Sequence, residues 1–201
     1  MNSLEAFNQS LFLQINASLT TPVWEMQIAL FMADFLIFVI PLALVSLWFW
    51  GDATERNLSL KACLVAFVAL GVNQIIIRVW PHPRPFMIGL GHAFIPHAAD
   101  PSFPSDHVTI FAGVGLSLLL GHARSVVGWA MLLLGLCVAW ARVFLGVHFP
   151  LDMLGAVAVA FIVWVVISMP WSVFGNPITQ AIEHVYRYLF ARPIARGLIR
   201  R

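Results

Sequence analysis

The chain has 201 residues, of which 61% are hydrophobic and only 10% are charged, and its net charge is +2. A soluble domain contains about 45–50% apolar and about 25% charged residues. This composition therefore excludes a water-soluble globule and a disordered chain, and two cysteines exclude a disulfide scaffold. We expect an all-α integral membrane protein, with residues 1–201 forming one membrane-embedded domain.

The apolar stretches predict an interfacial helix followed by five transmembrane helices. Apolar residues recur at helical spacing over residues 3–18, which indicates an amphipathic helix at the membrane interface within an N-terminal segment, residues 1–26. A core over residues 27–170 contains the predicted spans 27–50, 61–80, 107–123, 125–141 and 151–169. Only Asp34 and Pro41 break the uncharged apolar run of the first span, and we expect Pro170 to end the fifth. Residues 171–201 would then form a basic cytoplasmic tail.

The basic residues predict the orientation of the chain. Five spans place the termini on opposite sides, and Lys and Arg gather on the cytoplasmic side of a membrane. Eight of the 11 basic residues fall on one predicted side: Arg56, Lys61, Arg124, Arg187, Arg192, Arg196, Arg200 and Arg201. We expect this side to be the cytoplasm of a bacterium, with the N-terminus in the periplasm. The small excess of positive charge favours membrane lipids over nucleic acid as partners.

Three polar clusters fall on the predicted periplasmic side: residues 78–85, 101–107 and 142–152. The third and fifth spans begin there, so their free N–H groups and positive dipole ends would face one region, with Ser105 as an N-cap. Guanidinium groups of Arg78, Arg84 and Arg142 lie in the same clusters. Because Arg suits bidentate contacts with phosphate, we expect a phosphate- or diphosphate-binding site.

The spacing of His148 and Asp152 predicts a nucleophile. Four residues apart at the start of a helix, the carboxylate can accept a hydrogen bond from one ring nitrogen, which leaves the other nitrogen as a neutral nucleophile. His107 supplies a second imidazole, placed to protonate a leaving oxygen. Since the two histidines need opposite protonation states, we expect a bell-shaped pH dependence of activity.

These clusters resemble the signature motifs K-x6-R-P, P-S-G-H and S-R-x5-H-x3-D of the type-2 phosphatidic acid phosphatase superfamily. The run over residues 97–107 is similar to that of its bacitracin-resistance branch, the undecaprenyl-diphosphate phosphatases. The resemblance implies that His148 attacks phosphorus to form a phosphohistidine, that Asp152 orients His148, and that His107 protonates the departing polyprenyl phosphate.

The same resemblance implies the remaining parts of the site and the reaction. Arg84, Ser105 and Arg142 would hold phosphate oxygens, without a metal or other cofactor. The reaction would convert undecaprenyl diphosphate to undecaprenyl phosphate and phosphate at the outer face of the inner membrane, recycling the lipid carrier for cell-wall synthesis. The isoprenyl chain would lie between the spans. The sequence does not indicate an oligomeric state.

Three positions depart from the motifs, and one charged residue lies outside them. Arg78 precedes Arg84 by five intervening residues, where the motif has Lys and six. Asp106 replaces the motif glycine, so it must point away from an anionic substrate, pair with an arginine or help to position His107. Ala141 replaces the motif serine. Asp34 lies within the first predicted span, where an ionisable group is a candidate functional residue by default.

Other functions remain open on the sequence alone. A lipid phosphotransferase or a glycerolipid-phosphate phosphatase of the same superfamily would use the same residues. A different class, a small His-rich membrane transporter or metal-binding protein, would use His82, His92, His97 and Asp100.

Overall fold

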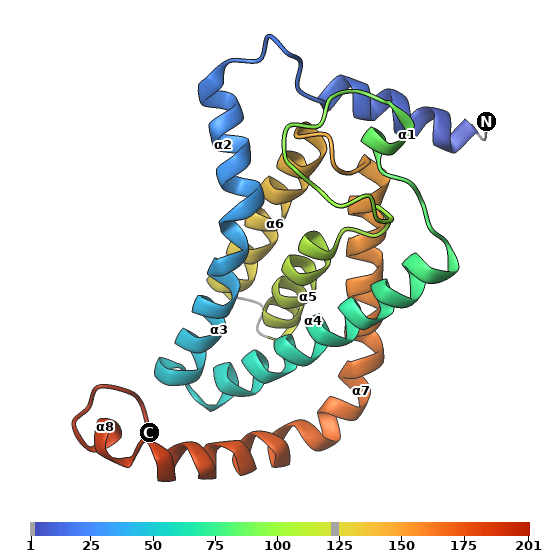
Figure 1. Cartoon of the computed structure of the whole chain (residues 1–201). Helices are drawn as coiled ribbons and strands as arrows, with labels where there is room; N and C mark the ends of the chain where they lie inside the picture. The colour runs from blue at the N-terminus through green and yellow to red at the C-terminus, as the bar shows by residue number, and fades with distance from the viewer. Residues whose placement is uncertain (1–2, 122–124) are drawn as a thin grey trace.

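The computed structural model describes residues 3–121 and 125–201, and the regular structure in these ranges is entirely helical. The elements are α1 (Ser3–Ile15), α2 (Val23–Asp34), η1 (Leu36–Phe38), α3 (Val39–Trp50), α4 (Ala53–Val79), η2 (Pro85–Ile88), α5 (Asp106–Gly121), α6 (Val126–Phe144), α7 (Pro150–Leu189) and α8 (Ala191–Ala195). Figure 1 shows α2 to α7 as a bundle, with α1 lying across one end. The predicted all-α membrane bundle is confirmed; Arg124 and most of the predicted turn before the fourth span lie outside the described residues.

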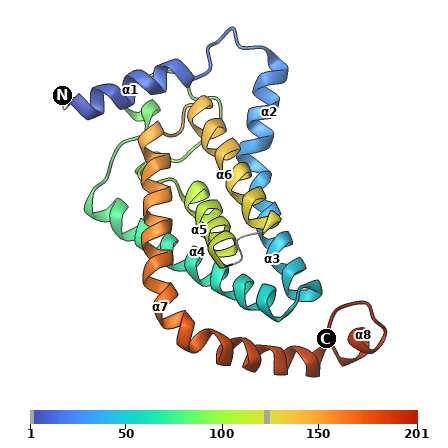
Figure 2. The same cartoon turned by 180° about the vertical axis from the view of Figure 1, so that it is seen from behind.

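Four helical stretches among the described residues are long and apolar enough to cross a membrane: Val23–Trp50, Ala53–Val79, Val126–Phe144 and Pro150–Leu189. The helix expected as the third span, α5, is apolar but has only 16 residues. It is the central helix of the bundle and packs against α4, α6 and α7. In Figures 1 and 2, α5 begins below the upper ends of α6 and α7, so loop backbone occupies the centre of the bundle above it. Such backbone is tolerated in a membrane protein where protein surrounds it.

Two prolines do not end α7 as we expected of Pro170. The helix continues through Pro170 and Pro177 to Leu189 and bends over this stretch (Figure 1). A proline removes one intrahelical hydrogen bond and kinks a helix, but contacts with α4 hold both sides of Pro170. Lys61 Nζ donates to Ser168 Oγ at 2.8 Å, and Trp171 Nε1 donates to Asn57 Oδ1 at 3.0 Å.

A buried arginine ties the C-terminal segment to the end of the bundle opposite α1. Arg56 lies 3.2 Å from Glu183 of α7 and donates to the carbonyl oxygens of Trp48 and Arg200 at 2.9 and 2.7 Å. Its guanidinium carbon lies 4.9 Å from the centre of the Tyr186 ring. The residues predicted as a tail are therefore partly an extension of α7 and partly a segment folded back onto α3 and α4.

The N-terminal helix is embedded on one face and exposed on the other. Its first half exposes Leu4 and Phe7, whereas Asn8 and Phe12 are buried against the bundle. Figure 2 shows α1 running across the ends of α6 and α7. The helix expected from the sequence is present, and its position at a membrane interface remains a prediction.

Candidate active site

The site forms where the loop between α6 and α7 meets the connector between α4 and α5. Gly146 in the first of these loops has φ +83°, a conformation that L side chains rarely adopt. A Cβ atom there would also meet the carbonyl group of His92, so the two loops approach closely because this residue is glycine. Pro150 opens α7 at its first position, as its fixed φ favours.

His148 and Asp152 form a buried pair at the start of α7. His148 Nδ1 lies 3.1 Å from Asp152 Oδ2, and the same oxygen accepts from the backbone N–H of Phe149 at 2.8 Å. His148 is 3% exposed and Asp152 is 1% exposed. Asp152 therefore caps the start of the helix and holds the histidine ring with one carboxylate.

Arg84 determines which nitrogen of His148 carries the proton. Its Nη1 lies 3.1 Å from His148 Nε2 and donates to the carbonyl oxygen of Val147 at 2.8 Å. Because a guanidinium only donates hydrogen bonds, Nε2 must accept. The proton then resides on Nδ1 and is donated to Asp152. His148 thus presents an unprotonated Nε2, which is the form a nucleophile requires.

The environment of His148 keeps its ring neutral. Burial lowers the pKa of His148 to about 4, because desolvation disfavours the charged ring more than the neighbouring Asp152 carboxylate favours it. The Arg84 and Arg142 guanidinium groups lower this pKa further. The ring is therefore neutral near pH 7.

The unprotonated nitrogen faces a small polar pocket. The pocket has a volume of about 170 Å³ and is lined by Gln74, Ile77, Arg84, His97, Asp100, Pro101, Pro104, Asp106, His107, Arg142 and His148. Arg142 is buried, and its Nη2 lies 3.5 Å from both His107 Nδ1 and His97 Nε2. A second buried guanidinium and a second imidazole therefore converge on the space that His148 Nε2 faces. Such a space suits an anion with several oxygens.

Two buried polar atoms of predicted site residues have no hydrogen-bond partner among the described residues: Arg142 Nε and Ser105 Oγ. Arg142 lines the pocket, whereas Ser105 lies between two residues that line it, Pro104 and Asp106, without lining it itself. Buried polar groups in folded proteins are almost always paired. Ser105 does precede α5, as expected of an N-cap, yet its side chain does not cap the helix; only its carbonyl oxygen accepts, from Thr109 N at 3.0 Å. The two unpaired groups fit the hydrogen-bonding needs of a phosphate.

A family model for the PAP2 superfamily matches residues 58–173, which is more than half of the chain. The chain belongs to the PAP2 superfamily. The matched range contains all the motif residues described above and leaves α1 and α2 outside it.

Relatives of this PAP2 protein agree with that assignment. YbjG of Escherichia coli (strain K12), named provisionally as an undecaprenyl-diphosphatase, is 40% identical over 98% of this chain and 99% of its own length. The undecaprenyl-diphosphatase BcrC of Bacillus subtilis (strain 168) is 35% identical over 68% of this chain and 69% of its own. A Bacillus subtilis PAP2-type phosphatidylglycerolphosphate phosphatase shares the fold, with a TM-score of 0.60, 19% identity and coverage of 84% of this chain and 86% of its own.

Asp106, which replaces the motif glycine of PAP2 proteins, points toward α4. Its Oδ1 accepts from Asn73 Nδ2 at 2.8 Å, and Asn73 Nδ2 also lies 3.0 Å from Thr109 Oγ1. Asn73 is fully buried. Asp106 lines the pocket without pairing with an arginine, and its contacts link the start of α5 to α4.

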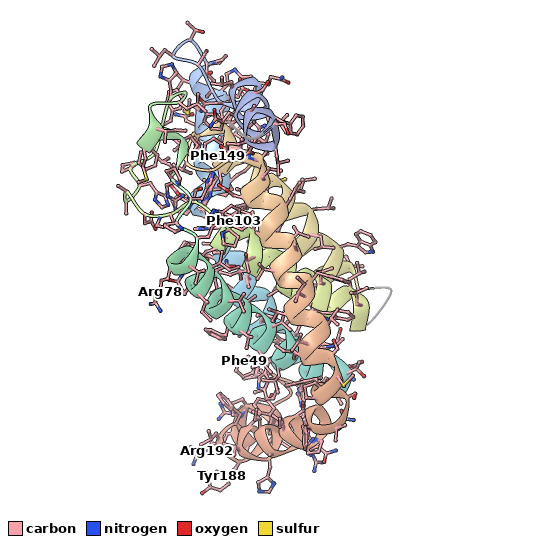
Figure 3. All side chains as sticks on the ribbon, turned by 90° about the vertical axis from the view of Figure 1, so that its right-hand side faces the viewer. Phe49, Arg78, Phe103, Phe149, Tyr188 and Arg192 are labelled. Carbon is pink, nitrogen blue, oxygen red and sulfur yellow. The ribbon has the colours of Figure 1, made fainter. Side chains whose placement is uncertain are left out.

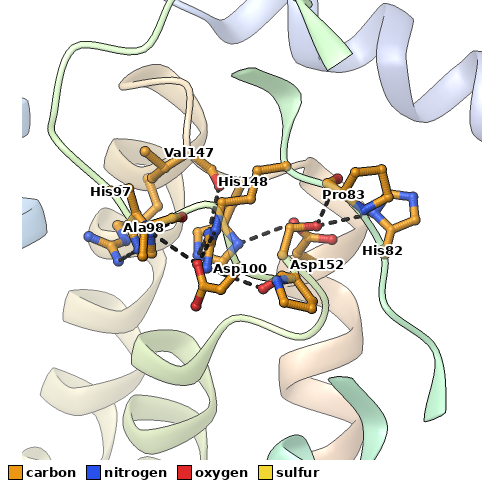
Figure 4. Close-up of polar contacts among 12 residues, drawn as sticks. His82, Pro83, His97, Ala98, Asp100, Val147, His148 and Asp152 are labelled. Carbon is orange, nitrogen blue, oxygen red and sulfur yellow. Dashed lines mark hydrogen bonds and ion pairs between the residues drawn. The ribbon is translucent and has the colours of Figure 1, made fainter. Parts of the chain in front are cut away.

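Two further residues of this PAP2 protein lie in the pocket although no motif contains them. Asp100 Oδ1 accepts from Arg84 Nε at 3.0 Å and lies 3.4 Å from His97 Nδ1. Burial acts to raise the pKa of Asp100, but the hydrogen bond and the positive charge of Arg84 outweigh burial, so this pKa is lowered. Figure 4 shows His97 and Asp152 on opposite sides of His148. In the sequence both His97 and Asp100 fall in the run over residues 97–107 that resembles the bacitracin-resistance branch, but the only role predicted for them was as possible metal ligands.

Two predicted site residues are not brought to the pocket. Arg78 is exposed at the end of α4 and points away from the bundle (Figure 3). Asp34 is exposed at the end of α2 and does not line the pocket. The five intervening residues before Arg84 therefore place Arg78 on the outer face of α4, outside the pocket that contains Arg84.

The histidines of the connector do not assemble into a metal site. No group of three or more His, Cys, Asp or Glu side chains with metal-binding geometry occurs within residues 3–121 and 125–201. His82 instead lies 3.4 Å from Glu5 of α1 and 3.1 Å from Ser102 Oγ. This arrangement gives no support to the metal-binding alternative.

Proposed function

We propose that the protein hydrolyses undecaprenyl diphosphate to undecaprenyl phosphate and inorganic phosphate at the outer face of a bacterial inner membrane. The observation that carries the proposal is the geometry of His148. Its Nδ1 is held by Asp152 and its unprotonated Nε2 faces a pocket with two buried arginines. The names of YbjG and BcrC support the choice of substrate.

The first step transfers the terminal phosphoryl group to the enzyme. His148 Nε2 attacks the terminal phosphorus, and the bond from this phosphorus to the bridging oxygen breaks. The electron pair of that bond leaves with undecaprenyl phosphate, to which His107 donates a proton. Arg84 is positioned to bind the transferred phosphoryl group, because the Nη1 hydrogen that now points to His148 Nε2 can turn to a phosphoryl oxygen. Arg142 and Ser105 supply the further donors that the developing charge requires.

The second step returns the enzyme to its starting state. A water molecule loses a proton to His107 and attacks the phosphohistidine, the bond between phosphorus and Nε2 breaks, and phosphate departs. Asp152 stabilises the His148 ring in both steps, since the hydrogen bond from His148 Nδ1 to the Asp152 carboxylate remains in place. The first step requires a neutral His148 and a protonated His107, and these opposite protonation states give the bell-shaped pH dependence. Proton donation then leaves His107 neutral for the second step.

An apolar groove lies along the bundle near the pocket and suits the polyprenyl chain. It has a volume of about 300 Å³ and is lined by residues of α3, α4 and α5, among them Ile40, Leu44, Cys63, Phe67, Leu70 and Ile110. Gln74 and His107 of the phosphate pocket lie about one helical turn beyond Leu70 and Ile110 on the same two helices.

The distribution of charge supports a periplasmic site. Arg56 and the arginines of the C-terminal segment gather at the end of the bundle opposite the pocket. Because basic residues favour the cytoplasmic side, the pocket end and α1 would face the periplasm.

The experiment uses the purified protein in detergent with EDTA and offers undecaprenyl diphosphate, phosphatidylglycerophosphate and phosphatidic acid in turn. We expect phosphate release from undecaprenyl diphosphate at the highest kcat/KM, and loss of that release in His148→Ala. Phosphate release that survives His148→Ala would refute the mechanism. A higher kcat/KM with phosphatidylglycerophosphate or phosphatidic acid would show that this glycerolipid, and not undecaprenyl diphosphate, is the preferred substrate. Transfer to an added lipid alcohol without free phosphate would indicate a phosphotransferase, and activity lost in EDTA but restored by zinc would favour a metal enzyme.

A further inference from the structure

One face of α1 is fastened to the loop that carries His148. Asn8 and Phe12 are four residues apart and so share a face of the helix, and Asn16 directly follows its last residue, Ile15. Each contacts the segment from Phe144 to Leu151 that joins α6 to α7, called here the catalytic loop. This face is the buried side of α1, whereas Leu4 and Phe7 are exposed.

Asn8 reaches the start of α7 directly. Its Oδ1 accepts from the backbone N–H of Leu151 at 3.1 Å, and the side chain is 2% exposed. Leu151 lies in the first turn of α7, whose N–H groups have no partner within the helix. Asn8 therefore acts as a cap supplied by a distant part of the chain, one residue before Asp152.

Phe12 and Asn16 hold the remainder of the catalytic loop. The Phe12 ring packs edge to face on Phe149, with 5.4 Å between ring centres, and Phe149 directly follows His148. Asn16 Nδ2 donates to the carbonyl oxygens of Phe144 and His92 at 3.0 and 2.9 Å. The backbone N–H of His92 donates back to Asn16 Oδ1 at 2.8 Å. Asn16 thus bridges the catalytic loop and the connector where they meet.

Packing does not duplicate the Asn8 contact. A cavity of about 800 Å³ lies between α1, the connector and α7, and both Asn8 and Asp152 line it. Loss of the Asn8 side chain would leave the Leu151 N–H unpaired and extend this cavity toward Asp152. An unpaired buried donor is a substantial penalty, which is relieved by movement of the loop or by water that enters the cavity, and either change alters the surroundings of Asp152.

We propose that α1 is a positioning element for catalysis, with Asn8 as the residue through which it fixes the start of α7 and hence the His148–Asp152 pair. The inference rests on the proposed function for its meaning, because His148 is the nucleophile there. It adds to that function a helix outside the region matched by the PAP2 family model. The exposed apolar side of α1 would place the same helix at the membrane surface.

The test compares Asn8→Ala with Asn8→Asp, which keeps an oxygen acceptor, and with Ser10→Ala on the exposed side of α1. We expect Asn8→Ala to lower kcat on undecaprenyl diphosphate about 10- to 100-fold with little change in KM, the effect of a small displacement of a catalytic group. Asn8→Asp should recover most of this loss, and Ser10→Ala should match the wild type.

Two further measurements separate positioning from a loss of folded protein. Amide hydrogen exchange of the catalytic loop should increase in Asn8→Ala while exchange in α5 stays unchanged. The acid side of the pH profile should also move upward, because a loosened loop admits water to His148, whose ring is now surrounded by Asp152, Arg84, Arg142, His107 and His97. Asn8→Ala with wild-type kcat, pH profile and loop exchange would overturn the inference. A wild type inactive on every lipid phosphate would instead refute the proposed function, and the exchange data would still decide whether α1 holds the loop.

Discussion

Replacement of Asp152 by Asn is the sharpest test of the His148 geometry. The Asn side chain has nearly the same shape, so its oxygen can still accept from the Phe149 N–H that Asp152 accepts at 2.8 Å. The same oxygen can also accept from His148 Nδ1, 3.1 Å away, because a single carboxylate oxygen makes both contacts in the wild type. Arg84 Nη1 still donates toward Nε2, so the proton stays on Nδ1. The exchange therefore keeps the geometry and removes the negative charge beside a ring that becomes cationic when Nε2 bonds to phosphorus.

The magnitude follows from these contacts. A hydrogen bond to a charged group contributes about 1.5–3 kcal/mol, which corresponds to about 10- to 150-fold in rate. We therefore expect Asp152→Asn to lower kcat by about 10- to 150-fold.

The assay measures phosphate release from undecaprenyl diphosphate together with thermal unfolding in detergent. Asp152→Asn should unfold at nearly the wild-type temperature because the cap on α7 is kept, whereas Asp152→Ala should lose both activity and stability. Asp152→Asn with a kcat within a few-fold of the wild type would show that the carboxylate charge does not stabilise the His148 ring during the reaction, and the mechanism would fail.

Three further predictions address the rest of the site. On the acid side, kcat/KM should fall to half its maximum near pH 4 and not near 6.5. The lowered pKa of His148 keeps Nε2 unprotonated until the pH falls to about 4. A half-maximum near pH 6.5 would contradict this prediction. Arg84→Lys should lower kcat/KM by about 10²-fold or more, since one ammonium cannot reproduce the four contacts of the guanidinium, while the exposed Arg78→Ala should stay within about twofold in the same assay. Gly146→Ala should reduce activity about tenfold or more by displacing the catalytic loop, whereas Gly71→Ala, which meets open space, is the matched control; equal activities would disprove the role of the close approach to His92.

Much of this molecule could be predicted from its sequence because its strongest signals are local. Uncharged runs of about 20 residues predict spans directly, and the i, i+4 spacing of His148 and Asp152 predicts their hydrogen bond. These features depend on residues close in the chain, so spacing alone determines their geometry.

Other features depend on contacts that the sequence does not encode locally. Pro170 ends a helix by local rules, yet contacts made by Ser168 and Trp171 with α4 carry the helix past it. The path of the connector brings Asp100 to Arg84, and no periodic pattern predicts the course of an irregular segment. Arg78 illustrates the converse, because its position in a motif did not reveal that its side chain faces outward.

The low start of α5 has a consequence for the proposed lipid substrate. Because α5 begins beneath the ends of its neighbours, the pocket residues Asp106 and His107 at its start lie within the bundle, and an apolar groove lies about one helical turn further along α4 and α5. Lifting a polyprenyl chain out of a bilayer would require about 0.8 kcal/mol for each buried CH₂ group, which is tens of kcal/mol for the whole chain. A pocket within the bundle removes that requirement. The head group can turn inward to His148 while the polyprenyl chain remains among hydrocarbon. The free energy of removing that chain from the bilayer is therefore not added to the activation barrier.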